Sequence, residues 1–413
     1  MIKNLNNKIF LTISVLVTVN YIFFVQRIIF RQNPYITADW LINYQGGFVR
    51  RGMIGEIFFQ LHSIIKIDIL YIVFFFNVIL LILFFYLIYN IIKHSLSNNI
   101  FLFYCLLPST LLFTFFDPLA VGRKDYLVII PYLFYAYFIE KLTTNIKIFL
   151  VVLFIIVSLS HELVFFFIPF LFIIKYLNFS NIKFTFKNFK FEIICSIVMG
   201  ITIFFLFLFK IPHNNELCQS LVNLKLNNEL CNGVIRDFSS PKVYSLDTIH
   251  NNFKYLEKFN YIPQYSIYII ITLLPTFVII FIKNINLRKK KIFFYYNIIS
   301  ILSIFPLIFV STDWGRYINI LFILNIVYFH FFLKNIGIIN FNLSLIKKII
   351  LTPFVFLYLT SWHMPHCCQE KMGSGYIYIV DRILFRINDE SNETHKFGKD
   401  FPREILKKLI NYF

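Results

Sequence analysis

Charged residues are scarce in this chain, and acidic ones are the scarcest. Of 413 residues, 15% are charged, with 21 Asp and Glu against 39 Lys and Arg, while 58% are hydrophobic. The mean hydropathy is +0.72. A soluble domain carries about a quarter of its residues as charges, so this composition excludes an ordinary soluble protein. The net charge of +18 would suggest nucleic-acid binding in a soluble protein, but in a membrane protein it follows from topology and from anionic lipid head groups. We therefore expect membrane lipid, and no nucleic acid, as a partner.

Motifs that identify a reaction are also missing. The sequence contains no phosphate-binding P-loop, no His-Glu-x-x-His, no Gly-x-Ser-x-Gly and no dinucleotide fingerprint. The run His363–Cys368 holds possible metal ligands but lacks the usual spaced pairs, so we predict neither a metal site nor a cofactor. There is no fixed-period repeat and few charges lie within the apolar stretches, which disfavours a transporter or flippase.

Long hydrophobic runs dominate what is present. A helix needs ~20 apolar residues to cross a bilayer. The sequence predicts an all-α, polytopic integral membrane protein with about 11 transmembrane helices (10–12), near residues 9–30, 67–92, 100–116, 126–139, 146–159, 163–177, 193–210, 263–283, 292–311, 317–334 and 349–362. No small-residue cleavage site follows the first run, which favours a retained span over a removed signal peptide.

The distribution of charge predicts an orientation. With a cytoplasmic N-terminus, the inward connections hold 17 Lys and Arg and only two acids, Glu140 and Glu192. The other 19 acids then face outward. A transmembrane domain over 1–362 would carry an outer first loop at 31–66 and an outer loop at 211–262, followed by an outer C-terminal tail at 363–413. Within the first loop, Gly52–Ile69 is expected to form an amphipathic interfacial helix.

The cysteines fit this map. Cys105 and Cys195 lie in spans and are expected to be small buried hydrophobes. The outer compartment permits disulfides. Because adjacent cysteines pair only under strain, we expect cross-links between the loop pair Cys218 and Cys231 and the tail pair Cys367 and Cys368, although spacing alone leaves the connectivity open.

The first outer loop carries the most suggestive cluster. Gly46 and Gly47 permit a tight turn and a close backbone approach to a ligand, and Arg50 and Arg51 follow them. Guanidinium groups bind phosphate in a bidentate manner, so this segment is a candidate site for a lipid-linked pyrophosphate. The alternative is a turn whose arginines reach lipid head groups.

Asp39, Trp40 and Tyr44 stand just before that loop. The carboxylate of Asp39 is a candidate catalytic base for an attacking hydroxyl, and the two aromatic rings are candidates for stacking on a sugar. A helix cap and an interfacial aromatic belt would explain the same residues without function.

Three further outer connections contain ionisable residues. Asp117 and Asp125 flank Arg123 and Lys124, a second possible anion contact or an internal salt bridge. His161 and Glu162 interrupt an apolar stretch, where ionisable residues usually mark function, although a short exposed loop would also contain them. The last connection repeats the mix of acid, aromatic and arginine seen in the first loop, with Asp313, Trp314 and Arg316. We predict catalytic roles for His161 and Asp313, and substrate contacts for Arg123, Lys124, Glu162, Trp314 and Arg316.

In length, span number and outer loops, the chain resembles multi-pass proteins of bacterial surface-polysaccharide biosynthesis. Two families are similar: O-antigen polymerases, which use arginines in periplasmic loops, and sugar transferases of the GT-C superfamily, which place an acid in the first outer loop, as Asp39 is placed here. The loop 211–262 has a single arginine, Arg236, and so departs from the polymerase pattern. The resemblance implies a polymerase or glycosyltransferase of the bacterial inner membrane, acting at the periplasmic face on polyprenyl-diphosphate-linked oligosaccharide together with other polysaccharide-assembly proteins. A transporter, a flippase or a non-catalytic assembly protein is the alternative.

Overall fold

The chain is helical throughout the part that the structure describes. The computed structural model describes residues 2–179, 184–208, 214–239, 246–282, 287–336, 355 and 357–367. In chain order its elements are α1 (Ile2–Phe30), α2 (Thr37–Leu41), α3 (Gly52–Ile65), α4 (Ile69–Ile92), η1 (Ser95–Ser97), α5 (Asn99–Cys105), α6 (Phe113–Phe116), η2 (Pro118–Ala120), α7 (Asp125–Phe138), η3 (Ile139–Lys141), α8 (Thr144–Ser160), η4 (Glu162–Phe167), α9 (Pro169–Asn178), α10 (Phe186–Leu208), α11 (Asn214–Asn223), η5 (Asn228–Asn232), α12 (Val234–Ser239), α13 (Leu246–Lys258), α14 (Tyr261–Ile282), α15 (Leu287–Val310) and α16 (Trp314–Ile336). No strand occurs among them, which confirms the all-α prediction for these residues.

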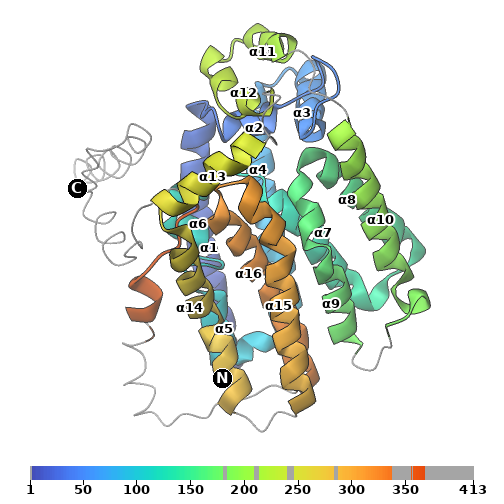
Figure 1. Ribbon diagram of the computed structural model, residues 1–413, viewed down its shortest axis with the longest axis vertical. Helices are drawn as coiled ribbons and strands as arrows, with labels where there is room; N and C mark the ends of the chain where they lie inside the picture. Colours follow the sequence, from blue (N-terminus) through green and yellow to red (C-terminus); the bar gives the residue numbers. More distant parts are fainter. Residues whose placement is uncertain are drawn as a thin grey trace.

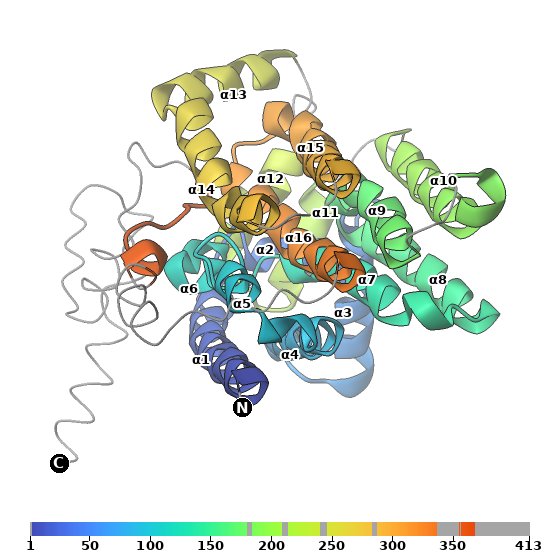
Figure 2. The ribbon, with the colours of Figure 1, turned by 90° about the horizontal axis from the view of Figure 1, so that it is seen from below.

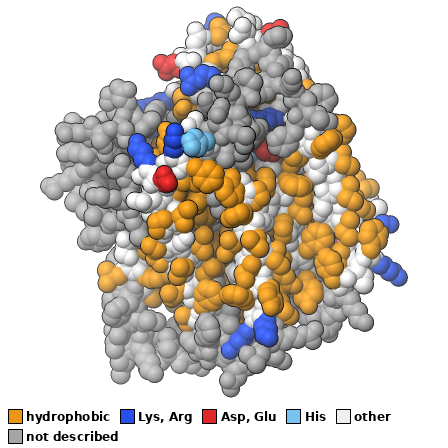
Figure 3. All heavy atoms as spheres, in the orientation of Figure 1, with side chains coloured by type: hydrophobic (Ala, Val, Ile, Leu, Met, Phe, Trp, Pro, Cys, Tyr) orange, Lys and Arg blue, Asp and Glu red, His pale blue; other side chains and the backbone are white. Residues whose placement is uncertain are grey.

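Several helices are long and apolar enough to cross a membrane. Among the described residues, five qualify by length and composition: Leu5–Phe30, Ile69–Ile92, Phe186–Leu206, Tyr261–Val278 and Trp314–Ile336. Figure 3 shows the corresponding surface, a broad apolar band with charged side chains above and below it. The total of eleven spans and the orientation stay predictions, and half of the expected span 349–362 lies outside the described residues.

The expected span 100–116 is not one helix. α5 ends at Cys105 and α6 begins at Phe113, with Pro108 between them, because proline cannot donate the backbone hydrogen bond that a continuous helix needs. Backbone groups freed at membrane depth must find partners within the protein. Asn319 of α16 supplies them: its Nδ2 donates to the carbonyl oxygens of Ser109 (3.0 Å) and Thr110 (2.8 Å). The break is therefore stabilised by a polar residue on another helix.

α16 is the central helix of the bundle. Every residue from Trp314 to Leu333 is buried. Figure 2 shows α16 surrounded by neighbours, and it contacts α4, α5, α7, α9, α14 and α15. Its polar side chains are engaged, as when His330 Nδ1 lies 2.8 Å from Ser95 Oγ. A helix enclosed on all sides holds its first residues in fixed positions, and these residues include Arg316.

The first long connection forms α2 and α3 at the upper end of the molecule in Figure 1. The expected helix after Gly52 is present but ends at Ile65, where Lys66 adopts a left-handed conformation (φ 59°). Asp68 caps the next helix, since its side chain accepts from the backbone N–H of Leu70 at 2.9 Å. Glu56 accepts the backbone N–H of Tyr44 at 3.0 Å and so orders the loop before α3.

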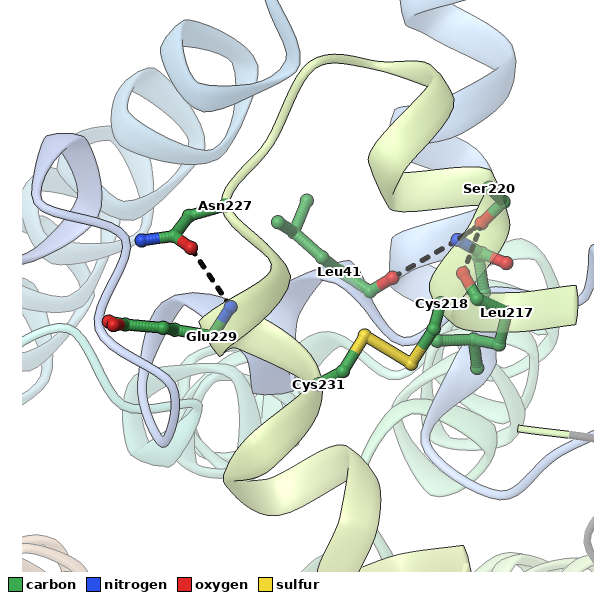
Figure 4. Close-up of a disulfide and its surroundings, with 8 residues drawn as sticks. Leu41, Leu217, Cys218, Ser220, Asn227, Glu229 and Cys231 are labelled. Atoms are coloured by element: carbon green, nitrogen blue, oxygen red, sulfur yellow. Dashed lines mark hydrogen bonds between the residues drawn. A yellow bond between two sulfur atoms is a disulfide. The ribbon is translucent and has the colours of Figure 1, made fainter. Parts of the chain in front are cut away.

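Residues 214–239, which we name the cap, cover α2. Figure 4 shows Leu41 of α2 beside the Cys218–Cys231 disulfide. Asn43 Nδ2 donates to Ser220 Oγ of α11 at 3.1 Å, and the backbone N–H of Val234 donates to the carbonyl of Pro34 at 3.1 Å. A Cβ on Gly233 would lie 2.1 Å from that same carbonyl oxygen, so only glycine permits this contact.

The disulfide corrects the expected cross-link between loop and tail. Cys218 and Cys231 pair with each other, with their Cα atoms 5.9 Å apart. They are 13 residues apart, and η5 turns the chain back so that the second cysteine meets the first. Cys368 lies outside the described residues. Cys105 and Cys195 are buried, as expected for small hydrophobes.

Candidate functional site

Ionisable side chains from distant parts of the sequence meet at one end of the bundle. We name this set the ionic cluster and divide it into three parts. The Arg51 group contains Asp39, Arg51, Lys124, His161 and Glu162; the Arg316 group contains Arg123, Asp125, Asp313 and Arg316; the third part is the pair Asp117 and His366. Each short connection that was expected on the outer side contributes residues to it.

The Arg51 group is centred on a bidentate ion pair between Arg51 and Glu162. Arg51 Nη2 lies 2.5 Å from Glu162 Oε1, and Nε donates to Oε2 at 2.8 Å. Such parallel bonds are the strongest arginine–carboxylate arrangement. Arg51 Nη1 and Lys124 Nζ each lie 3.6 Å from the same oxygen, Asp39 Oδ1. One carboxylate oxygen is therefore shared by two cations that belong to different elements.

The backbone holds Arg51 in an unusual conformation. Arg51 has φ +65°, in the left-handed region, immediately before α3. α3 packs tightly on the preceding loop, because a Cβ on Gly52 would lie 2.3 Å from Tyr44 Cε1 and one on Gly55 would lie 1.9 Å from the Ile42 carbonyl oxygen. Left-handed backbone at a non-glycine residue costs about 1–3 kcal/mol and is typical of functional sites. Gly52 and Gly55, which follow the arginines, therefore help to position Arg51, in addition to Gly46 and Gly47 before them.

The predicted glycine turn is present beside this group. Gly47 has φ +105° and donates its N–H to the carbonyl of Tyr44 at 2.9 Å, a conformation that favours glycine. Gly46 is buried and Gly47 is exposed. Arg50 is buried, with 7% of its surface exposed, and its charge helps to lower the pKa of Glu162.

The Arg316 group joins the start of α16 to the start of α7. Arg316 Nη2 and Nε reach the two oxygens of Asp125 at 2.6 and 3.0 Å, while Nη1 reaches Asp313 Oδ2 at 2.6 Å. Arg123 Nη1 lies 3.8 Å from that Asp313 oxygen. Arg316 is thus held by two carboxylates, whereas Arg123 makes one long contact with the group.

The electrostatics of the Arg51 group keep its acids ionised. Burial acts to raise the pKa of Asp39, but Lys124 and Arg51 outweigh it and the net shift is downward. Burial also acts to raise the pKa of Glu162, but the charge and hydrogen bonds of Arg51 outweigh it and hold this pKa well below its ordinary value. Burial lowers the pKa of Lys124 to about 8, against the influence of Asp39. Lys124 therefore loses its charge in a range where an ordinary lysine keeps it.

His161 is neutral at neutral pH. Burial and then Arg51 hold its pKa well below 6.5. Its Nδ1 accepts the backbone N–H of Leu163 at 3.3 Å, so the ring proton belongs on Nε2. This geometry gives His161 the role of a cap for η4 and of an N–H donor at Nε2. It disfavours the expected role as a base, because the accepting nitrogen is already occupied.

Asp117 and His366 form the tightest contact between the segment 361–367 and the rest of the site. The carboxylate of Asp117 accepts from the backbone N–H of Leu119 (3.0 Å), the backbone N–H of His366 (2.6 Å) and the His366 ring at Nδ1 (2.7 Å). The charge of His366 and its hydrogen bonds overcome the effect of burial and lower the pKa of Asp117 to about 2. The sequence analysis did not predict this pair and named His366 only within a run of possible metal ligands.

Trp40, expected to stack on a sugar, and Trp314, expected to contact the substrate, are both enclosed. Trp40 is fully buried: its Nε1 donates to the Gly122 carbonyl at 2.6 Å and its ring packs against Phe58 and Phe76. Trp314 is 6% exposed and packs against tyrosines 261 and 265 of α14. Both rings are enclosed by neighbouring side chains in this conformation, and their contact with a substrate stays a prediction.

Tyr44 is different, because it lies at the surface. Its ring is half-buried and stacks on Phe48, with ring centroids 5.2 Å apart. Phe48 is 38% exposed. Residues 44 and 48 together therefore present an accessible aromatic surface beside the Arg51 group, and the sequence analysis had named only the tyrosine.

The fold and the site define a class: an all-helical protein with several potential membrane-crossing helices and a buried ionic cluster at one end of the bundle. No protein-family profile, curated protein or solved structure matches the chain.

Proposed function

We propose that this protein is a membrane polymerase or glycosyltransferase that acts on polyprenyl-diphosphate-linked glycans in O-antigen or capsule synthesis. One observation carries the proposal: charged side chains from five separate segments are buried together at one end of apolar helices. Taking charges out of water is costly, and ionisable residues at such positions usually serve a ligand.

The cations of the cluster divide into two kinds. Arg51 and Arg316 are each fixed by short bonds to carboxylates, so they brace the site. Arg123 has a single ion pair of 3.8 Å in the cluster, its side chain is 17% exposed, and its Nε makes no hydrogen bond to a described residue. A guanidinium with unused donors suits a diphosphate oxygen. We therefore assign the first diphosphate contact to Arg123, with Arg50 and Lys124 adding positive charge.

Asp39 is the candidate for orienting the acceptor hydroxyl. Its Oδ1 is buried and accepts no hydrogen bond from a described residue, although two cations lie 3.6 Å away. A buried acceptor without a hydrogen bond is costly and calls for a partner. A sugar hydroxyl donating to Oδ1 would supply it. In the transfer, the acceptor oxygen attacks the anomeric carbon, the bond from that carbon to the diphosphate oxygen breaks, and the polyprenyl diphosphate leaves with the bonding electrons.

The test is surface glycan made by a deletion strain that carries single variants. Asp39→Asn, Arg123→Ala and Asp313→Asn should each abolish long chains, whereas Lys334→Ala, at the opposite end of the bundle, should leave the chain-length ladder normal. Retention of single repeat units points to a polymerase, and complete loss of the unit points to an earlier transferase. Normal ladders from all three cluster variants would refute the catalytic proposal and favour an assembly role.

A further inference from the structure

Asp39 and Asp313 are poor proton acceptors, so neither of these two acids is an evident base for the proposed transfer. The pKa of Asp39 is lowered by Lys124 and Arg51, and that of Asp313 is lowered strongly by Arg316 and Arg123 despite burial. An efficient general base has a pKa near the operating pH. His161 uses its accepting nitrogen to cap η4. The proton of the attacking hydroxyl therefore needs another destination.

His366 has the geometry of such a destination. Asp117 is ionised, so its Oδ2 accepts and His366 Nδ1 carries the hydrogen across the 2.7 Å contact. The lone pair of a neutral ring is then on Nε2. A carboxylate that fixes the tautomer and orientation of an imidazole is the arrangement by which histidine bases are held ready for proton transfer.

The backbone around His366 is fixed by the site itself. The carbonyl of His366 accepts the N–H of Gly315 at 3.0 Å, and the carbonyl of Pro365 accepts Tyr265 Oη of α14 at 3.1 Å. A Cβ on Gly315 would lie 1.8 Å from the Pro365 oxygen, so the absence of a side chain there allows the segment to lie on the start of α16. The next residue of α16 is Arg316, which ties His366 to the Arg316 group.

The charges that face His366 come from every neighbouring part of the cluster. Asp117 and Asp313 raise its pKa, Arg123 and burial lower it, and the net shift is upward from 6.5. His363 lies close enough to influence Asp117. The side chain of His366 is 11% exposed, so it is largely buried while the Asp117 carboxylate holds it.

We propose that His366, held by Asp117, is the proton acceptor of the transfer reaction and that the segment 361–367 completes the active site. This rests on the proposed function. As the acceptor oxygen bonds to the anomeric carbon and the diphosphate departs, the hydroxyl proton passes to His366 Nε2, giving an imidazolium that the Asp117 carboxylate stabilises. The ring then returns this proton to water or to the departing diphosphate, which restores the neutral imidazole.

The experiment follows chain growth in membrane vesicles from the complemented deletion strain, together with binding of polyprenyl diphosphate to the purified full chain in lipid nanodiscs. His366→Ala should slow growth by about 10²–10⁴-fold while binding is retained, since base catalysis contributes that factor. Asp117→Asn should lower the pKa of His366 and move the acid limb of the pH–rate profile to lower pH. His94→Ala, an exposed histidine at the opposite end, is the control.

His366→Gln separates chemistry from folding, because an amide can still donate to Asp117 but cannot accept the proton. It should bind polyprenyl diphosphate normally and remain slow. Normal rates in either His366 variant, or an unchanged acid limb of the pH–rate profile in Asp117→Asn, would overturn the role of His366. Neither result would bear on the proposed function itself. If the His366 variants lost binding as well as rate, the segment 361–367 would have only a structural role, and the proposed proton transfer to His366 would also be overturned. If the wild-type chain neither supports chain growth nor binds polyprenyl diphosphate, the proposed function fails as well.

Discussion

The two ends of the helical bundle hold ion pairs of opposite character. At the cluster end, Arg316 and Asp125 pair with side chains only 6% and 12% exposed, and Arg316 also serves Asp313. At the opposite end, Lys334 and Glu140 pair with 49% and 59% exposed. An isolated exposed pair contributes at most about 1 kcal/mol, whereas breaking a buried one is far more costly. The low exposure of the Arg316–Asp125 pair and its link to Asp313 show that the cluster is part of the packed fold, unlike the exposed Lys334–Glu140 pair.

A buried pair at the opposite end sharpens this contrast. Glu192 is fully buried and accepts Lys175 Nζ at 2.8 Å and Tyr135 Oη at 2.6 Å. It is a closed set that joins α7, α9 and α10. The cluster end differs because Asp39 Oδ1 and Arg123 Nε make no hydrogen bonds to described residues. Unused hydrogen-bonding capacity therefore separates the cluster from the closed set around Glu192.

The largest expected effect comes from Arg316. Replacing it with alanine leaves Asp125 buried without its cation, so Arg316→Ala should lower the free energy of unfolding by about 3–5 kcal/mol. Denaturant unfolding in detergent micelles measures this change. Arg316→Lys keeps the charge but not the paired bonds, and we expect it to recover only part of the loss. A loss below about 1 kcal/mol for Arg316→Ala would mean that the pair behaves like a surface one.

The next effect concerns the cap over α2. Reduction, or the double variant Cys218→Ser and Cys231→Ser, removes a cross-link across 13 residues. A disulfide that closes a loop of this length contributes about 3 kcal/mol to the free energy of unfolding, so we expect a loss of that size. Amide hydrogen exchange in residues 214–239 should speed up, and Asp39 beneath them should become more accessible. Unchanged exchange in the cap would show that its contacts with Pro34 and Asn43 suffice without the disulfide.

Lys124 provides a pH test. Its pKa of about 8 means that its charge disappears as the pH rises through that value. Binding of polyprenyl diphosphate should therefore weaken above about pH 8, and Lys124→Met should remove that part of the pH dependence. For stability the sign is opposite: between about pH 8 and the ordinary value of 10.5 the unfolded chain binds more protons, so Lys124 makes folding more favourable as the pH rises. Flat affinity from pH 7 to 9.5 would contradict a role in anion binding.

The smallest effect belongs to the exposed pair. Lys334→Ala should change the free energy of unfolding by less than about 1 kcal/mol, and added salt should reduce even that difference. The same denaturation measurement detects it. A loss comparable to that of Arg316→Ala would remove the contrast between the two ends.

Sequence reasoning found the cluster but not its internal roles. The gathering of residues 39, 51, 125, 162, 313 and 316 followed from placing short polar connections on one side of apolar helices. The burial of Trp40 could not be predicted in this way, because a tryptophan at the end of a helix can equally well lie at the surface. It depends on the packing of Phe58 and Phe76 and on the Gly122 carbonyl.

The break between α5 and α6 and the partner of Asp117 were missed for a related reason. Pro108 was a local signal for a helix break, and Asn319, more than 200 residues later, supplies the hydrogen bonds that stabilise it. His366 stood in a run that resembled metal ligands, and its partner is 249 residues away in the chain. No periodic sequence pattern links residues that are so far apart in the chain, so these contacts could not be predicted from the sequence. The glycine at 315, next to Arg316, was the one local hint that another backbone approaches closely there.

The most direct test of the account is the affinity of the full chain for polyprenyl diphosphate in lipid nanodiscs, measured for Arg123→Ala and Lys334→Ala side by side. Both variants remove one positive charge, but only Arg123 belongs to the ionic cluster and has a free Nε. Loss of a charge-assisted hydrogen bond of about 1.5–3 kcal/mol predicts a decrease of at least about tenfold for Arg123→Ala. Lys334→Ala should bind like the wild type. Equal affinities for both variants would contradict an anion-binding site in the cluster.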